Sequence, residues 1–159
     1  MTMANTFVHL RVHSEYSMVD GLVRVKPLIS RVAELGMPAV GLTEQSNMCS
    51  LVRFYKAAMG AGVKPIIGAD IWLENPDEPE TPFRLTLLAR DNDGYLNLTE
   101  IISQGYTEGQ RYGKPIVQKS WLESRAKGLI VLSGAKMGDV GKALLAGKPE
   151  LARERADYW

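Results

Sequence analysis

Short apolar runs alternate with amphipathic helical patterns along this chain, and the alternation limits the folds that it can adopt. The run at residues 38–43 is almost wholly apolar, as in a strand that is buried on both faces of a sheet. Residues 48–59, which come next, carry apolar side chains at helical spacing. A repeated strand, helix, strand order is typical of a parallel sheet with helices packed outside it, so the sequence predicts the α/β class.

The same patterns assign the rest of the chain. Strands are predicted at 7–13, 38–43, 64–73, 84–89 and 128–133, and helices at 27–35, 48–59, 95–105, 120–126, 137–145 and from 149 onward. Loops are predicted at 14–21, 44–47, 75–82 and 106–114. Both a doubly wound sheet and a (β/α) barrel fit this order, and in both the chemistry lies at the C-terminal ends of the strands.

Composition narrows the function classes. The 159 residues suffice for about one domain, and 19 basic against 18 acidic residues give a net charge of +1, which does not favour direct DNA binding. A single cysteine, Cys49, excludes an internal disulfide and fits a reducing cytoplasm. No apolar run approaches the ~18 residues that a membrane span needs. The helical pattern from residue 149 has no closing turn, so we expect a piece of a longer chain.

The first predicted strand and the loop after it carry both histidines of the chain. Strand alternation predicts that Phe7, His9, Arg11 and His13 share one face, opposite a fully apolar one. Such a strand directs imidazole and guanidinium groups toward a site. His13 ends this strand, and Asp20 lies in the loop that follows it.

Polar residues also stand at the ends of the later strands. The set consists of His13, Asp20, Glu44, Gln45, Asp70 and Arg84, and the fifth strand leads into Ser133, Gly134 and Ala135. Two readings of this set stay open. His13, Asp20, Glu44 and Asp70 offer ligands for a divalent metal. Alternatively, Arg11 and Arg84 neutralise the carboxylates in an ion-pair network, because a guanidinium cannot act as a metal ligand.

Five segments carry a resemblance to a known family. They are Phe-Val-His-Leu-Arg-Val-His-Ser-Glu-Tyr-Ser-Met-Val-Asp-Gly at 7–21, Gly-Leu-Thr-Glu-Gln-Ser-Asn at 41–47, Gly-Val-Lys-Pro-Ile-Ile-Gly-Ala-Asp at 62–70, Leu-Leu-Ala-Arg-Asp-Asn-Asp-Gly-Tyr-Leu-Asn-Leu at 87–98 and Leu-Ile-Val-Leu-Ser-Gly at 129–134. In this order the chain closely resembles the PHP (polymerase and histidinol phosphatase) domains at the N-termini of bacterial DNA polymerase III alpha subunits. The resemblance covers nearly all of residues 6–159.

The resemblance implies a fold and its limits. PHP domains are distorted (β/α)7 barrels, and a barrel usually needs ~250 residues. Residues 1–159 are therefore expected to form the N-terminal part of a PHP domain, an incomplete barrel of parallel strands with outer helices. The polymerase active site and its Mg²⁺ belong to later domains of such a subunit. No catalytic residue of nucleotidyl transfer is expected in this chain.

Active PHP domains bind a metal cluster through a defined ligand pattern, and this sequence departs from it. The resemblance implies His at 11, Asp-His at 44–45, Glu at 70, His at 84 and Cys at 135, whereas His13 and Asp20 keep the pattern. The eight vestigial metal-site positions are Arg11, His13, Asp20, Glu44, Gln45, Asp70, Arg84 and Ala135. We expect no metal and no other cofactor in this chain.

The two arginines suggest what replaces the metal. Our hypothesis is that Arg11 and Arg84 supply the lost positive charge and hold Asp20, Glu44 and Asp70 ionised. The favoured reading is then a catalytically silent scaffold domain of a replicative DNA polymerase. In this family such domains dock a separate proofreading exonuclease and assemble with other replicase subunits, while DNA is bound through the whole subunit. The alternative is a metal-dependent phosphoesterase or 3′–5′ exonuclease that uses His13, Asp20, Glu44 and Asp70.

Overall fold

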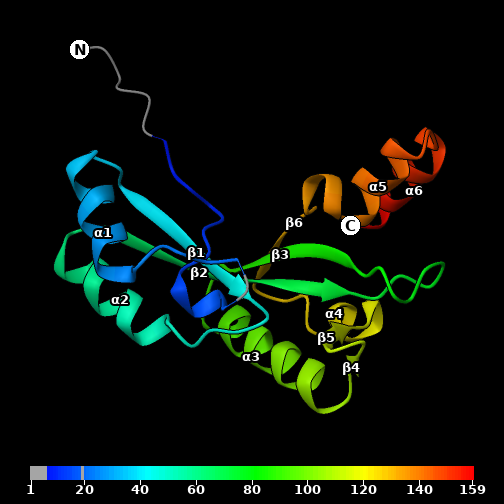
Figure 1. The fold of residues 1–159 in the computed structure, drawn as a ribbon, viewed down its shortest axis with the longest axis horizontal. Helices are drawn as coiled ribbons and strands as arrows, with labels where there is room; N and C mark the ends of the chain where they lie inside the picture. Colours follow the sequence, from blue (N-terminus) through cyan, green and yellow to red (C-terminus); the bar gives the residue numbers. More distant parts are fainter. Residues whose placement is uncertain (1–6, 19) are drawn as a thin grey trace. The chain divides into compact units, whose positions relative to one another are not determined.

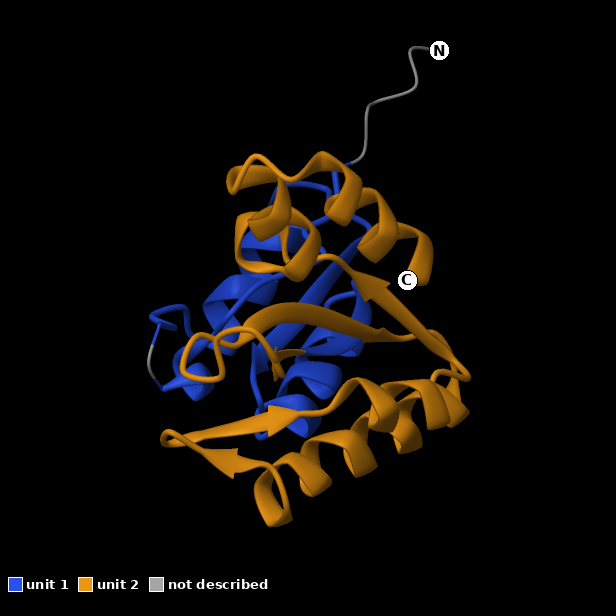
Figure 2. Ribbon diagram, turned by 90° about the vertical axis from the view of Figure 1, so that its right-hand side faces the viewer, with its two compact units in different colours: residues 1–69 blue, residues 70–159 orange. Residues whose placement is uncertain are grey.

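The computed structural model of the chain describes residues 7–18 and 20–159 and confirms the α/β class. The chain folds as two compact units, residues 1–69 and residues 70–159 (Figure 2). Figure 1 labels the helices and strands within each unit. The helices are α1 (Val25–Glu34), α2 (Leu51–Gly60), α3 (Asn92–Thr107), α4 (Lys119–Ser124), α5 (Asp139–Leu145) and α6 (Pro149–Tyr158), with 3-10 turns η1 (Glu15–Ser17) and η2 (Ala135–Met137). The strands are β1 (Ala39–Gln45), β2 (Lys64–Leu73), β3 (Phe83–Ala89), β4 (Gln110–Arg111), β5 (Lys114–Val117) and β6 (Leu129–Leu132). Within the described residues, no helix is long and apolar enough to cross a membrane.

The first unit packs α1 and α2 with the paired strands β1 and β2. Both helices bury one apolar stripe, as their spacing predicts, and α1 ends where Gly36 takes a left-handed φ of 66°. Six of the seven residues of β1 are buried, which confirms the reading of residues 38–43 as an interior strand. The core of this unit consists of Val25, Ile29, Val32, Val40, Leu42, Phe54, Ala58 and Val63.

The prediction of a regular strand at residues 7–13 is wrong. Residues 7–13 run beside β1 and make one parallel bridge, between His9 and Val40. The backbone carbonyl oxygens of His9 and Val12 accept from the amides of Gly41 (2.6 Å) and Thr43 (2.9 Å). Leu10, on the apolar face of the predicted strand, is exposed. Residues 15–17 of the predicted loop 14–21 form η1, and Val19 lies outside the described residues.

The second unit contains antiparallel pairs that the sequence did not indicate. Its strand order is β4-β5-β2-β3-β6, and β2 enters the unit at Asp70. The β2–β5 pair is parallel, with Trp72 opposite Ile116. In contrast, β6 runs antiparallel to β3, and β4 runs antiparallel to β5. The expectation that every strand is parallel is therefore wrong, although helices cover the sheet as predicted.

The predicted loop 106–114 contains the turn of a tight hairpin. Gln110 and Arg111 form β4 and pair with the first residues of β5. The two turn residues, Tyr112 and Gly113, have φ values of 52° and 70°. Positive φ at both central residues is the geometry of the two-residue turns that fit the twist of a hairpin.

Two glycines set the position of α3. The side chain of Asp91 accepts from the amide of Gly94 at 3.0 Å and caps the helix. A Cβ atom on Gly94 would lie 1.8 Å from the carbonyl oxygen of Gly128. The start of α3 therefore approaches the chain before β6 more closely than any other residue type allows.

The helical spacing of apolar residues also predicts that Val52, Phe54 and Tyr55 on α2, and Leu96 and Leu98 on α3, face inward, and three of these predictions are wrong. Val52 and Tyr55 on α2 and Leu96 on α3 are exposed, whereas Phe54 and Leu98 are buried. The wrong residues lie beside the buried stripe, at positions that a broad helical pattern includes. The helices themselves are confirmed, and their observed bounds differ from the predicted ones by a few residues.

Candidate functional site

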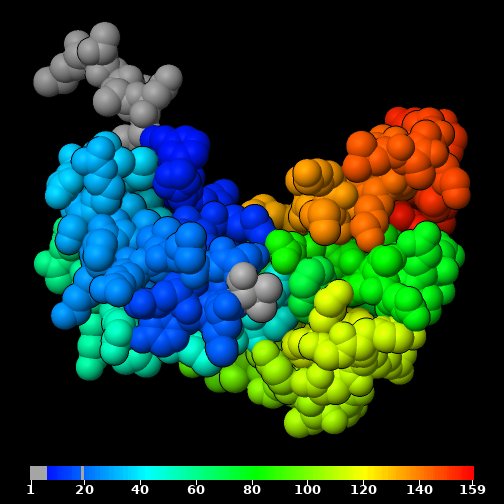
Figure 3. Space-filling model, in the orientation of Figure 1, coloured from blue at the N-terminus to red at the C-terminus, as the bar shows by residue number. Residues whose placement is uncertain are grey.

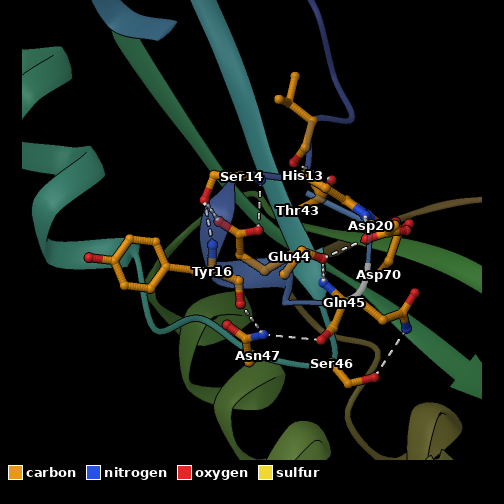
Figure 4. A network of polar contacts seen from close by, with 12 residues as sticks. His13, Ser14, Tyr16, Asp20, Thr43, Glu44, Gln45, Ser46, Asn47 and Asp70 are labelled. Carbon is orange, nitrogen blue, oxygen red and sulfur yellow. Dashed lines mark hydrogen bonds and ion pairs between the residues drawn. The ribbon is translucent and has the colours of Figure 1, made fainter. Parts of the chain in front are cut away.

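The end of β1 buries a carboxylate that accepts three hydrogen bonds. The Glu44 side chain is only 1% exposed. Its Oε2 accepts from the backbone amide of Ser14 at 2.9 Å, and its Oε1 accepts from the Ser50 hydroxyl at 2.8 Å. Oε1 also accepts from the Ser14 hydroxyl. Figure 4 shows Ser14 and Glu44 directed toward one another.

The local fold explains this arrangement. Ser14 is the residue before η1, and Ser50 is the residue before α2, so Glu44 ties both turns to the end of β1. Both serines are buried, at 0% and 2% exposure. A carboxylate has about four acceptor positions, and three are used here. The sequence patterns did not indicate Ser14 and Ser50, because Ser14 lies in a predicted loop and Ser50 lies inside the predicted helix 48–59.

A second set of contacts links His13 to the residue after Glu44. The Nδ1 atom of His13 lies 2.7 Å from Oδ1 of Asp20, and the Ser17 hydroxyl donates to the same oxygen at 3.0 Å. Ser17 Oγ in turn accepts from the backbone amide of Gln45 at 3.0 Å. The Gln45 side chain donates to Ser46 (Figure 4). The structure therefore brings the side chains of His13 and Asp20 close to the backbone of Gln45.

Arg11 also lies in the first unit, exposed on the segment beside β1, and the second unit holds Asp70, Arg84 and Ala135. Asp70 is fully buried, and its Oδ1 accepts from the hydroxyl of Thr86, which is also buried. The guanidinium carbon of Arg84 lies 4.7 Å from the centroid of the Trp72 ring, a cation–π contact. Ala135, where the family pattern has cysteine, is exposed in η2 with a left-handed φ of 47°.

The donor set of these residues does not fit a metal cluster. The Glu44 carboxylate accepts three hydrogen bonds from serine hydroxyl and backbone donors, and the Asp70 carboxylate accepts one from the Thr86 hydroxyl. Across residues 7–18 and 20–159, no group of three or more His, Cys, Asp and Glu side chains lies close enough to hold a metal ion. Gln45 and Ala135 offer no imidazole or thiolate where the family pattern has them.

The hypothesis of the two arginines needs one correction. Glu44 is held by the hydroxyls of Ser14 and Ser50 where we expected a guanidinium, so for this carboxylate the hypothesis is wrong. The hydroxyls suffice because they donate directly to the buried charge. Pairing of Arg11 and Arg84 with Asp20 and Asp70 stays a prediction.

The chain is similar to a known domain family and to known polymerase subunits. The PHP domain family model matches residues 9–159. DNA polymerase III subunit alpha of Pseudomonas aeruginosa is 58% identical over 157 residues, which are 99% of this chain and 13% of that protein. The same subunit of Pseudomonas fluorescens is 54% identical over 158 residues, again 99% of this chain and 13% of that protein. The Escherichia coli K12 subunit is 49% identical over 153 residues, 96% of this chain and 13% of that protein. The chain thus spans about an eighth of the length of these relatives.

Proposed function

Since the chain belongs to the PHP domain family, we propose that it is part of a DNA polymerase III alpha subunit, which synthesises chromosomal DNA on a DNA template. The identity of 58% to the Pseudomonas aeruginosa subunit supports this, because it extends over 99% of the chain. The polymerase activity and its Mg²⁺ then belong to the parts of the subunit outside this chain. DNA is bound through the whole subunit.

The proposed role of the chain itself is that of a catalytically silent, metal-free scaffold. The observation that carries this role is the hydrogen bonding of Glu44. Its buried carboxylate accepts from Ser14 and Ser50 and so stabilises the turns before η1 and α2. Glu44 thus contributes to folding stability. Three of its about four acceptor positions are used, so one is left for a cation.

Metal analysis of the purified chain tests this role. We expect substoichiometric zinc and manganese by mass spectrometry, and no hydrolysis of p-nitrophenyl phosphate after either metal is added. Stoichiometric metal together with chelator-sensitive hydrolysis would overturn the scaffold role. The hydrolysis assay takes a His13→Ala variant as its control, because a contaminating phosphatase does not respond to this substitution.

The alternative is a metal-dependent phosphoesterase or 3′–5′ exonuclease. The close approach of His13 and Asp20, at 2.7 Å, is the observation that favours it, because both residues match the ligand pattern of active family members. Glu44 and Asp70 would supply the remaining ligands. In that case, an excess of manganese must displace the Ser14 and Ser50 hydroxyls from Glu44, and hydrolysis must depend on all four residues.

We also propose partners for the scaffold. A replicative polymerase works within a holoenzyme, and a domain without its own nuclease is suited to dock a separate proofreading exonuclease subunit. We place the protein in the cytoplasm, where the chromosome is copied. Co-purification of the chain with the exonuclease subunit of Pseudomonas aeruginosa tests the docking. Retention at physiological salt is the expected result, and complete loss of the exonuclease during gel filtration would contradict it.

A further inference from the structure

A groove in the first unit lies apart from the site described above. It has a volume of about 610 Å³ and is lined by Tyr16, Lys26, Cys49, Val52, Arg53, Lys56 and Ala57. Lys26 comes from the first turn of α1, and the last four lining residues come from α2. In Figure 4 the ring of Tyr16 points away from Glu44 and its hydrogen-bond partners. The groove is therefore separate from the vestigial metal-site positions.

The charges around this groove have one sign. Three of its lining residues, Lys26, Arg53 and Lys56, are cationic, and none is acidic. Residues 46–69, which include α2, contain no Asp or Glu. Arg53 and Lys56 are exposed, and the Arg53 guanidinium carbon lies 5.7 Å from the centroid of the Tyr16 ring. An anionic occupant would meet attraction from every charged side chain in the groove.

Apolar surface accompanies these cations. Val52 lines the groove and is 62% exposed, and Tyr55 and Met59 on the same helix are 50% and 57% exposed. These three residues follow at spacings of three and four, so they form one stripe along α2. Figure 3 shows the surface of this unit in the blue to green part of its colour scale. An apolar stripe beside cations suits a ligand that carries both carboxylates and apolar side chains.

We propose that the groove between α1 and α2 binds an acidic segment of a partner protein, with an apolar side chain against Val52 and carboxylates against Lys26, Arg53 and Lys56. The occupant is defined by this charge and shape, and the proposal does not depend on the metal-site positions or on the parent polymerase. A nucleic acid is the less suitable occupant. Its backbone needs a row of phosphate contacts, whereas the chain has a net charge of only +1 and the groove is partly apolar.

The chain offers a direct probe of this groove. Cys49 is its only cysteine, it lines the groove, and it is exposed. The experiment measures how fast Cys49 of the 159-residue chain reacts with a fluorescent maleimide, with and without the synthetic peptide Glu-Asp-Glu-Leu-Glu-Asp-Phe-Glu. A peptide in which Gln and Asn replace every acid is the uncharged control. Fluorescence anisotropy of the labelled peptide gives the Kd.

Charge reversal in the groove gives the matched variants. R53E/K56E is expected to weaken binding of the acidic peptide by at least about tenfold, since two attractive contacts become repulsive. Lys26→Glu tests the same groove from α1, should the α2 variant not fold. Lys64→Glu is the control, because Lys64 is exposed in the same unit and does not line the groove.

The expected result is that the acidic peptide slows labelling of Cys49, and that the groove variants lose binding while Lys64→Glu keeps it. Three results would each overturn the proposal. The acidic peptide fails to protect Cys49 at millimolar concentration, Lys64→Glu loses as much affinity as the groove variants, or an oligothymidylate of the same charge protects Cys49 better than the peptide.

Discussion

The hydrogen bonds of Glu44 make a quantitative prediction through Ser50→Ala. The substitution removes the hydroxyl that donates to Glu44 Oε1 at 2.8 Å, and both residues are buried. A hydrogen bond to a charged group contributes ~1.5–3 kcal/mol, so we expect the free energy of unfolding to fall by about 2 kcal/mol. For a chain of this size, this corresponds to a decrease in Tm of ~4–8 °C.

Urea unfolding followed by circular dichroism measures this change. The midpoint of the transition should fall without a change of the slope, because the variant alters stability and not the surface exposed on unfolding. Ser30→Ala, an exposed serine on α1, is the control and should change the free energy by less than ~0.5 kcal/mol. A loss for Ser50→Ala as small as that of the control would refute the view that hydroxyls hold Glu44.

Two further experiments test the geometry of the same contacts. Ser14→Ala and Ser50→Ala should couple, because both hydroxyls donate to the same oxygen of Glu44, and the coupling should exceed ~0.5 kcal/mol in a double-mutant cycle. Glu44→Gln should cost less than Glu44→Leu. The amide can accept from the Ser14 backbone and donate to both hydroxyls, whereas leucine removes the acceptor of three donors, the Ser14 amide and the Ser14 and Ser50 hydroxyls. Equal losses for the two substitutions would contradict this geometry.

Three predictions concern other parts of the chain. The Gly94 amide and the Arg90 side chain lower the pKa of Asp91, so the contribution of this carboxylate to stability is present above pH ~4 and is lost as the pH falls through the lowered pKa. An NMR titration of Asp91 measures its pKa, and Asp91→Asn should abolish this contribution to the pH dependence of stability. Burial and the hydrogen bond to Glu123 raise the pKa of Tyr158 to about 12, and ultraviolet titration should lose its last phenol transition in Tyr158→Phe. The β6 strand lies at the edge of its sheet and is wholly apolar, with Ile130 and Val131 exposed. The chain should therefore self-associate in sedimentation experiments, and Ile130→Lys should reduce this association.

Much of the fold could be predicted because its signals are local. The burial of β1 follows from its continuous apolar run, and α1 ends where Gly36 permits a left-handed φ. The predictions fail where the structure of a segment depends on residues far away in the sequence. Residues 7–13 have the alternation of a strand but pair with β1 through an isolated bridge at His9 and Val40. The antiparallel direction of β6 has no signature in its own sequence. The β4–β5 turn was missed because Tyr112 is an unusual residue at positive φ.

The site shows the same division. His13 and Asp20, which the sequence selects as candidate site residues, are in contact in the structure, whereas the assignment of the vestigial metal-site positions stays a prediction. The role of Glu44 was not predicted, because it depends on Ser14, which lies 30 residues away, and on the turn that brings Ser50 back to the same oxygen. A pattern of ligand types indicates which residues are present, but the direction in which each lone pair points is a property of the folded chain.

Calorimetric titration of zinc onto the chain tests the central claim most directly. We expect no stoichiometric binding to the chain as it is, because its carboxylates serve as structural acceptors. The comparison is a variant that restores the family ligands, with the substitutions R11H, E44D, Q45H, R84H and A135C. This variant should gain measurable affinity for zinc. One-to-one binding of zinc by the unchanged chain, lost in His13→Ala, would contradict the account.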